Sequence, residues 1–235
     1  MTPLARTRIK ICGLTREQDV DAAVEAGADA VGFVMYDKSP RFITVARAAE
    51  LARRLPAFVT PVLLFVNADA TKIIAATSQL AGAAIQFHGD ETQEQCLAAT
   101  GNGARPYLRA ARIPLDPGEP FDLVKFASDH SRAQALLLDA HVEGFGGGGK
   151  AFNWSRVPPN VNAHLVLSGG LTPANVIDGI LQVRPRCKTL AVDVSSGVEI
   201  SKGIKDAGKI NQFVAAVRAA DRQLAESNHV PLPAA

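Results

Sequence analysis

Side chains that can accept or donate protons stand at the ends of short apolar runs in this sequence. They include a thiol, an imidazole and several carboxylates, which are the groups that carry out general acid–base catalysis. Where strands alternate with helices, the carboxyl ends of parallel strands meet and form the active site. We therefore expect these groups to surround one pocket. The positions at or near a predicted strand end are Cys12, 37–41, Asn67, His88, Asp139 and Asp193.

Two glycine-containing turns follow the last two predicted strands. In barrels of alternating strands and helices, phosphate commonly binds to the loops after the seventh and eighth strands. Glycines let backbone N–H groups approach an anion closely, and a helix N-terminus adds partial positive charge. The alternative is that these glycines only make tight turns, but their presence after both strands favours a phosphate site. Its predicted residues are Gly169, Gly170, Ser195, Ser196 and Gly197.

The segment Gly144–Ala151 reads GFGGGGKA and resembles a nucleotide-binding P-loop. A P-loop needs a serine or threonine after its lysine to bind Mg²⁺, and a helix must start there. Ala151 supplies no such ligand, and Phe152–Ser155 is a poor helix start. We therefore predict that Gly144–Lys150 is a mobile flap over the active site and does not bind ATP.

Eight short, nearly continuous apolar runs alternate with amphipathic, alanine-rich segments. Such runs are typical of parallel strands that are buried on both faces. Eight nearly equal units without a dinucleotide-binding motif favour a closed (β/α)8 barrel, the TIM barrel, over an open sheet. We predict one domain over 1–235, with the barrel at about 8–225 and a disordered tail at 227–235. The predicted strands are Ile9–Cys12, Ala30–Met35, Val59–Val66, Ala83–Phe87, Pro106–Ala110, Ala135–Asp139, His164–Ser168 and Leu190–Val194.

Several helix starts can be predicted from their capping residues. Thr15 and Gln18 have the spacing of a capping box, and Thr172 is expected to cap a helix that begins with Pro173. The last helix should begin at about Asp206. Between 139 and 164 the chain is rich in glycine and then in proline, so we expect only a short helix there.

The composition excludes several classes of protein. The formal net charge is +2 and the basic residues are scattered, so no nucleic-acid partner is expected. No apolar run is long enough to cross a membrane. Three cysteines without metal-ligand or disulfide spacing indicate reduced thiols and a cytoplasmic protein. No metal site is predicted, and the expected partner is a small phosphosugar bound by a monomer or homodimer.

A set of motifs, in order along most of the chain, resembles the phosphoribosylanthranilate isomerase family. The opening KICG and the closing DVSSGVE are specific to that family. The flap differs from the family's usual GGTGK by having GGGGK, followed by Asn153-Trp154. The matching segments are KICGLT (10–15), GFV (32–34), SPR (39–41), QFHGDE (86–91), LLLDA (136–140), GKAFNW (149–154), LSGGL (167–171) and VDVSSGVE (192–199).

The resemblance implies an activity and roles for individual residues. N-(5-phosphoribosyl)anthranilate, an aminoaldose, is converted to a 1-deoxyribulose 5-phosphate ketose by an Amadori rearrangement in tryptophan biosynthesis. The cysteine of KICG, Cys12, is implied to be the general base, and the aspartate of LLLDA, Asp139, the general acid. Arg41 is implied to bind the anthranilate carboxylate. The other implied substrate-binding residues are Gln86, His88 and Asp193.

The reaction makes opposite demands on the acid and the base. Asp139 must hold a proton near neutral pH, and burial at the barrel mouth favours a protonated carboxyl. A free thiol is only a few per cent thiolate at pH 7. We therefore expect the positive charge of Lys10 or Arg41 to lower the pKa of Cys12. The substrate's own amine supplies the electron sink, so no cofactor is expected.

Other functions remain as alternatives from the sequence. The nearest is another aminoaldose or sugar-phosphate isomerase of the phosphate-binding barrel group, such as the histidine-pathway enzyme. That enzyme has an aspartate in place of Cys12 and binds two phosphates, whereas the stretch 67–69 is not a second glycine-rich loop. A non-catalytic phosphosugar-binding barrel would have lost Cys12 or Asp139. Both residues are present, which favours the enzyme.

Overall fold

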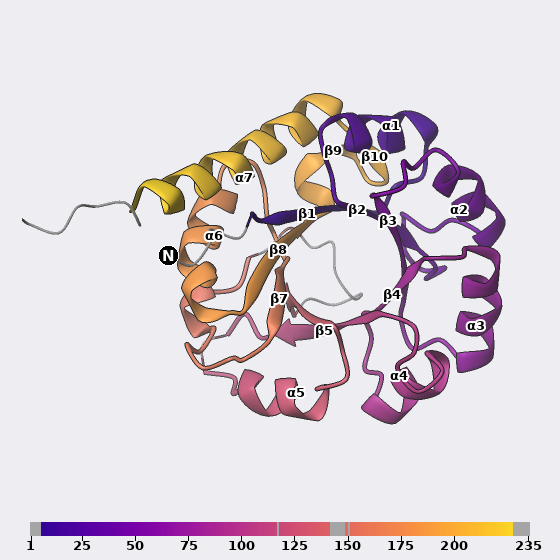
Figure 1. Ribbon diagram of the computed structural model, residues 1–235, viewed down its shortest axis with the longest axis horizontal. Coiled ribbons are helices and arrows are strands. Elements are labelled where there is room, and N and C mark those ends of the chain that lie inside the picture. The colour runs from indigo at the N-terminus through magenta and orange to yellow at the C-terminus, as the bar shows by residue number, and fades with distance from the viewer. Residues whose placement is uncertain (1–5, 117, 142–148, 150, 228–235) are drawn as a thin grey trace, which may run out of the picture.

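The structure is a computed structural model that describes residues 6–116, 118–141, 149 and 151–227. Its eight main strands are parallel and close into a barrel, because the last strand pairs with the first. Figure 1 looks along the barrel, with the strands as an inner ring and the helices outside them. The strands are β1 (Arg8–Cys12), β2 (Ala30–Val34), β3 (Thr60–Phe65), β4 (Ala84–Phe87), β5 (Tyr107–Ile113), β6 (Ala135–Ala140), β7 (His164–Leu167) and β8 (Thr189–Val194).

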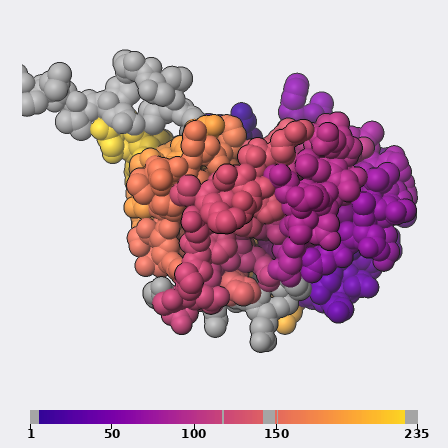
Figure 2. All heavy atoms as spheres, turned by 90° about the horizontal axis from the view of Figure 1, so that it is seen from below, coloured from indigo at the N-terminus to yellow at the C-terminus, as the bar shows by residue number. Residues whose placement is uncertain are grey.

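Helices follow most of the strands and cover the outside of the ring. Figure 2 shows the barrel from the side, with consecutive parts of the chain following one another around it. The α-helices are α1 (Glu17–Glu25), α2 (Val45–Ala52), α3 (Ala70–Gln79), α4 (Gln93–Ala99), α5 (Leu123–Asp129), α6 (Val176–Val183) and α7 (Ala207–Ser227). The shorter elements are the 3₁₀ turns η1 (Trp154–Arg156), η2 (Arg184–Arg186) and η3 (Ser196–Val198), and the antiparallel hairpin of β9 (Glu199–Ser201) and β10 (Ile204–Lys205).

The predicted (β/α)8 barrel is confirmed, and all eight predicted strands are present within a few residues of their expected bounds. β5 begins at Tyr107 and runs on to Ile113, three residues further than expected. Alternate residues of a strand point to opposite faces. In β1, Ile9 and Ile11 belong to the main hydrophobic core, whereas Cys12 packs with Val34 at the barrel mouth.

Two of the predicted helix starts are wrong. α1 has no side-chain cap, and the hydroxyl of Thr15 instead donates to the carbonyl of Gly203 at 2.8 Å. α6 begins at Val176 rather than after Thr172. The capping box that does form joins Thr92 and Gln95 at the start of α4.

Other local predictions agree with the structure where it describes the chain. α7 begins directly after Asp206, whose carboxylate accepts from the N–H of Lys209 at 2.9 Å. Within the described part of the β6–β7 connection, η1 is the one helical turn. The predicted flap Gly144–Lys150, apart from Gly149, lies outside the described residues, as does the tail after Ser227.

Candidate active site

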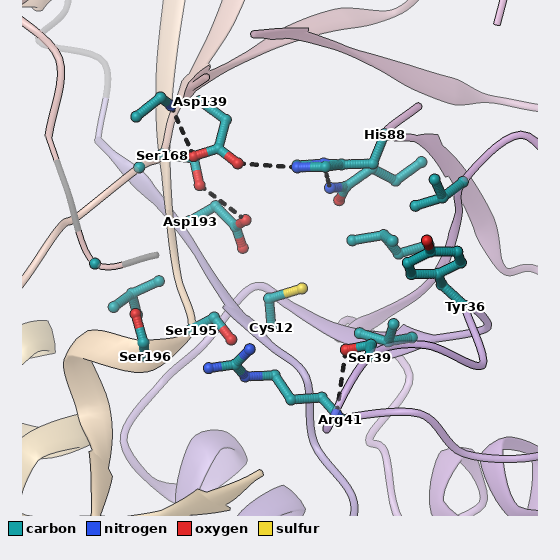
Figure 3. Close-up of a pocket in the computed structure, with 18 of the residues that line it drawn as sticks. Cys12, Tyr36, Ser39, Arg41, His88, Asp139, Ser168, Asp193, Ser195 and Ser196 are labelled. Atoms are coloured by element: carbon teal, nitrogen blue, oxygen red, sulfur yellow. Dashed lines mark hydrogen bonds and ion pairs between the residues drawn. The ribbon is translucent and has the colours of Figure 1, made fainter. Parts of the chain in front are cut away.

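A pocket opens at the carboxyl ends of the strands, and it brings together most of the predicted site residues (Figure 3). Among the strand-end positions, Asp37 and Asn67 are absent from the pocket lining, and Asn67 instead bonds to the stretch after β4. Its N–H donates to the carboxylate of Glu91 at 2.7 Å and its side-chain oxygen accepts from the N–H of Asp90. The predicted residues that line the pocket are Cys12, Arg41, Gln86, His88, Asp139, Gly169, Gly170, Asp193, Ser195 and Ser196.

One side of the pocket is a chain of hydrogen bonds from β4 to β6. The Gln86 amide nitrogen lies 2.9 Å from Nδ1 of His88, and Nε2 of His88 lies 2.9 Å from Oδ2 of Asp139. With the amide donating to Nδ1, the ring proton of neutral His88 lies on Nε2 and points at the carboxyl group. The N–H of Ala140 donates to the other oxygen, Oδ1, at 2.9 Å. All three side chains are buried, so Asp139 is held in one orientation.

The opposite side is built around a buried ion pair between β1 and β8. The strand register places Lys10 beside Asp193, and Nζ lies 2.8 Å from Oδ1. Ser168, which follows β7, lies 3.3 Å from the other carboxylate oxygen. Cys12 lies two residues after Lys10 on the same face of β1, next to Gly32 of β2. A side chain at Gly32 would meet the sulfur at 2.7 Å, so glycine leaves room for the thiol.

The thiol of Cys12 corrects one prediction from the sequence. Burial raises the pKa of Cys12 above that of an ordinary cysteine. Lys10 and Lys205 act in the opposite direction, as expected for nearby cations, but burial outweighs them. The predicted positive charge is therefore present in Lys10, whereas the predicted net lowering of the pKa is wrong.

Arg41 enters the pocket from the loop after β2, and its guanidinium group is held by Glu199. Its Nε and Nη2 each lie 2.8 Å from an oxygen of Glu199, in a bidentate ion pair. Both side chains are buried, so the pair is not a surface salt bridge. Gly13, with a φ of +77°, makes room for the arginine stem, because a side chain there would lie 2.5 Å from Cδ of Arg41.

The glycine-containing loops after β7 and β8 lie side by side at the pocket. Gly169 and Gly170 have φ values of +74° and +62°, which favour glycine. Gly197 is absent from the described pocket lining, although it was predicted to bind phosphate. A side chain at Gly197 would lie 2.0 Å from the carbonyl oxygen of Leu171. Gly197 therefore allows the two loops to pack together.

The structure adds residues in and around the pocket to which the sequence motifs assigned no role. Tyr36 and Ser168 line the pocket without having been predicted there, and Ser39 lies there as expected for the stretch 37–41. Glu199 ends the VDVSSGVE motif, but its arginine partner is far away in the sequence. Lys205 is buried in the two-residue strand β10, for which no sequence signal was available.

Several residues outside the pocket contribute to packing instead of to the site. Cys96 is buried in α4, Cys187 is half-buried before β8, and both are free thiols. Trp154 is partly buried and lies against Gly179 of α6, which agrees with a packing role. In the described part of the chain, no three histidine, cysteine or acidic side chains are placed to hold a metal ion. None of the described helices is long and apolar enough to span a membrane.

The fold and pocket together define the class of protein. A closed (β/α)8 barrel with glycine-containing loops after its seventh and eighth strands is typical of enzymes that bind phosphorylated substrates. Side chains that can donate and accept protons at the same mouth are typical of enzymes that use general acid–base catalysis.

Comparisons with known proteins specify the family. Residues 9–216 match the family model for N-(5'-phosphoribosyl)anthranilate (PRA) isomerase. N-(5'-phosphoribosyl)anthranilate isomerase of Methylibium petroleiphilum is 64% identical over 94% of this chain and 99% of its own length. The enzyme of Leptothrix cholodnii is 61% identical over 92% of this chain and 93% of its own length.

Solved structures agree with this result. Phosphoribosyl anthranilate isomerase from Thermus thermophilus superimposes with a TM-score of 0.78 at 30% identity, covering 91% of this chain and 99% of that one. A phosphoribosyl anthranilate isomerase in complex with reduced 1-(o-carboxyphenylamino)-1-deoxyribulose 5-phosphate has a TM-score of 0.72 at 36% identity, with the same coverage. This chain belongs to the phosphoribosylanthranilate isomerase family. It converts N-(5-phosphoribosyl)anthranilate to 1-(2-carboxyphenylamino)-1-deoxyribulose 5-phosphate in tryptophan biosynthesis, by an Amadori rearrangement.

Proposed function

We propose that Cys12 is the general base and Asp139 the general acid of this isomerisation. The observation that carries the proposal is that both side chains line one pocket, from the ends of β1 and β6. A reaction with two proton movements on neighbouring atoms of one ribose needs two such groups facing a common space.

The first step opens the ribose ring. Asp139 donates its proton to the ring oxygen, the C1′–O bond breaks, and the substrate nitrogen forms a Schiff base with C1′. The contacts from His88 and the N–H of Ala140 support this role, since they fix the direction of the carboxyl group.

The second step moves a proton from carbon. The thiolate of Cys12 takes the C2′ proton, and the electron pair moves toward the positively charged Schiff base. The resulting enolamine tautomerises to the ketone as C1′ gains a proton. Lys10 supports this role because its ammonium group stabilises the thiolate electrostatically. C2′ is oxidised as C1′ is reduced, so no external oxidant or reductant is needed, and the substrate nitrogen accepts the electron pair in between.

The remaining residues hold the two ends of the substrate. We assign Arg41 to the anthranilate carboxylate, since guanidinium groups bind carboxylates strongly. Gln86, His88 and Asp193 surround the ribose. The phosphate is assigned to the loops carrying Gly169, Gly170, Ser195 and Ser196, with Gly197 acting through loop packing.

The state of the protein in the cell forms a separate part of the proposal. A relative from Thermotoga maritima is described as a dimeric phosphoribosylanthranilate isomerase. We expect this chain to be a monomer or a homodimer, which analytical ultracentrifugation distinguishes. Its free thiols support a cytoplasmic location, which fractionation of cells would test.

The proposed roles can be tested with substrate deuterated at C2′. In the wild-type enzyme, transfer of this proton to Cys12 should give a primary kinetic isotope effect whenever the second step limits the rate. Asp139→Asn should make ring opening limiting and so suppress the isotope effect along with kcat. Cys12→Ser should retain or increase the isotope effect while kcat falls. If the two variants behave in the opposite way, the assignments of acid and base are wrong.

A further inference from the structure

Lys205 is a fully buried cation that the proposed mechanism does not use. Its side chain has 0% exposure, although it comes from a two-residue strand near the surface of the barrel mouth. Nζ lies 2.8 Å from Oε1 of Glu199 and 3.0 Å from the carbonyl oxygen of Ser195. The ammonium group also lies 3.3 Å from the Ser195 hydroxyl. Burying a charge is costly unless it is paired and hydrogen-bonded, and Lys205 meets this condition through Glu199 and Ser195.

The contacts of Lys205 reach both ends of the assigned substrate site. Through Glu199, the ammonium group is linked to Arg41, because the same Oε1 accepts from Nε of Arg41 at 2.8 Å. Through Ser195, it is linked to the loop after β8 that lines the pocket. An anion-binding loop must turn its carbonyl groups away from the ligand. Lys205 donates a hydrogen bond to the Ser195 carbonyl, which directs that carbonyl toward the ammonium group.

The charges of this cluster favour an anionic ligand. Arg41 and Lys205 share a single carboxylate, that of Glu199, so the buried trio carries one excess positive charge. Because buried charges are stabilised by partners of opposite sign, the excess is best compensated by a negative group at the pocket. The substrate carries two such groups, a carboxylate and a phosphate.

We propose that Lys205 is a positioning residue that aligns both anion-binding elements of the active site, Arg41 and the Ser195 loop, for one substrate. The proposal rests on the assignment of Arg41 and Ser195 to the two ends of the substrate. It adds a shared support, so that one buried ammonium group sets the geometry at both ends.

The main chain around Lys205 is anchored independently of its side chain. The N–H of Lys205 donates to Asp19 at 3.3 Å, and its carbonyl accepts from Arg16 at 3.3 Å. Replacement of the side chain should therefore leave the hairpin in place. Glu199 would keep its bidentate partner Arg41, so no buried carboxylate would be left unpaired.

The test compares Lys205→Met with Lys202→Met, a matched change at an exposed lysine in the turn of the same hairpin. Loss of a charged support should raise KM about 10- to 100-fold while kcat changes less than about threefold. Lys202→Met should behave as the wild type. Because methionine fills the buried space, the melting temperature of Lys205→Met should not fall. An unchanged KM, or a loss of kcat in proportion to lost folded protein, would overturn the proposal.

Two further measurements show whether Lys205 acts through both elements. In the double variant Arg41→Met, Lys205→Met, the increase in KM should be smaller than the product of the two single increases. Both changes disable the same carboxylate site. Inhibition by inorganic phosphate should weaken in Lys205→Met but not in Arg41→Met. Multiplicative KM effects together with unchanged phosphate inhibition would contradict the shared support. Lys205→Gln repeats each measurement should Lys205→Met fail to fold.

The carboxylate site at Arg41 and the role of Lys205 are tested separately by the single variants. If Arg41→Met leaves KM unchanged, the assignment of the carboxylate site is wrong. If Arg41→Met raises KM and Lys205→Met does not, the assignment stands and the role of Lys205 is refuted.

Discussion

The two sides of the barrel mouth provide opposite surroundings for a proton. On one side, Asp139 contacts His88 and a backbone N–H, and among the described residues neither lysine nor arginine forms an ion pair with it. On the other side, Cys12 lies beside Lys10, which is paired with Asp193. Figure 3 shows Asp139 and His88 across the cavity from the Cys12 sulfur.

This difference fits the proposed roles of Asp139 and Cys12, although burial still raises the pKa of the thiol. A proton donor must remain protonated until it acts, so a nearby lysine would oppose its function by favouring the carboxylate. A thiol must lose its own proton before it can accept one from carbon, and a nearby ammonium group favours that anionic form. A closed ring of strands can supply both environments a short distance apart, because each strand carries its own end residues to the same mouth.

The largest effect is expected when the central group of either side is removed. Cys12→Ala and Asp139→Asn should each lower kcat by about 10²- to 10⁴-fold, the usual contribution of a positioned acid or base. Steady-state turnover of N-(5-phosphoribosyl)anthranilate measures the effect. Cys96→Ala is the control, since it removes a buried thiol in α4 that is outside the described pocket lining. A fall in kcat with Cys96→Ala equal to that with Cys12→Ala would remove the special role of the thiol at the mouth.

The next largest effect is expected when the positive charge of Lys10 beside Cys12 is removed. Removal of the ammonium group in Lys10→Met should raise the pKa of Cys12 further, because Lys10 opposes the effect of burial. Alkylation by iodoacetamide should then be several-fold slower at a given pH, because a smaller fraction of the thiol is ionised. The experiment uses the background Cys96→Ala, Cys187→Ala, in which Cys12 is the remaining thiol.

The same pH series gives the control for this change. The unmodified background should already react slowly near pH 7, because its thiol titrates above the ordinary range. Lys188→Met, at an exposed site before β8, should leave the alkylation profile unchanged. Equal profiles for Lys10→Met and the background would show that charge on this side does not control the thiol.

A smaller effect is expected from the support of the acid side. In Gln86→Leu, the loss of the amide leaves Nδ1 of His88 without its partner, so both tautomers of the ring become accessible. We expect kcat to fall about tenfold, as is typical when a residue that orients a catalytic group is lost. KM should change little. Gln79→Leu, at an exposed position of α3, should have neither effect. A change in KM alone would show that Gln86 acts through its place beside the ribose and not by orienting His88.

The sequence predicted the strands better than the helix starts, and the reason is physical. A strand such as Ala135–Ala140 is buried on both faces, so its apolar run is visible without knowledge of its neighbours. A capping residue has a choice of partners. The hydroxyl of Thr15 bonds to Gly203, 188 positions away, which local spacing could not reveal.

The same distinction applies to the active site. The residues at strand ends could be predicted to share one site, because a barrel brings the carboxyl ends of all its strands together. The partner of Arg41 is Glu199, 158 positions away, and the support from Lys205 depends on the depth of burial. Burial also reverses the predicted direction of the pKa shift of Cys12. The sequence shows the nearby lysine but not how deeply the sulfur is buried.

The smallest catalytic effect is expected at His130, a buried histidine outside both sides of the mouth. His130 follows α5 and stacks on Phe126 with ring centroids 4.5 Å apart. Its Nδ1 has no hydrogen-bond partner in the structure, whereas both ring nitrogens of His88 are bonded. Burial, followed by the charge of Arg109, lowers the pKa of His130 to about 4. His130→Gln should leave kcat and KM within about twofold at pH 7, as for a change away from substrate.

The effect of His130 should appear in stability as the pH falls. The unfolded chain binds a proton at this histidine below about pH 6.5, whereas the folded protein does so only near pH 4. Unfolding therefore takes up a proton between these values, so the contribution of neutral His130 is present above pH 6.5 and is lost as the pH falls toward 4. Between pH 7 and pH 5 the loss should be about 2 kcal/mol of unfolding free energy. Urea unfolding of wild type and His130→Gln at both pH values measures it, and the variant should lack this part of the decline. Equal declines would assign the acid sensitivity to other groups, whereas a pH-dependent loss of kcat in His130→Gln would extend the catalytic site beyond the two sides of the mouth.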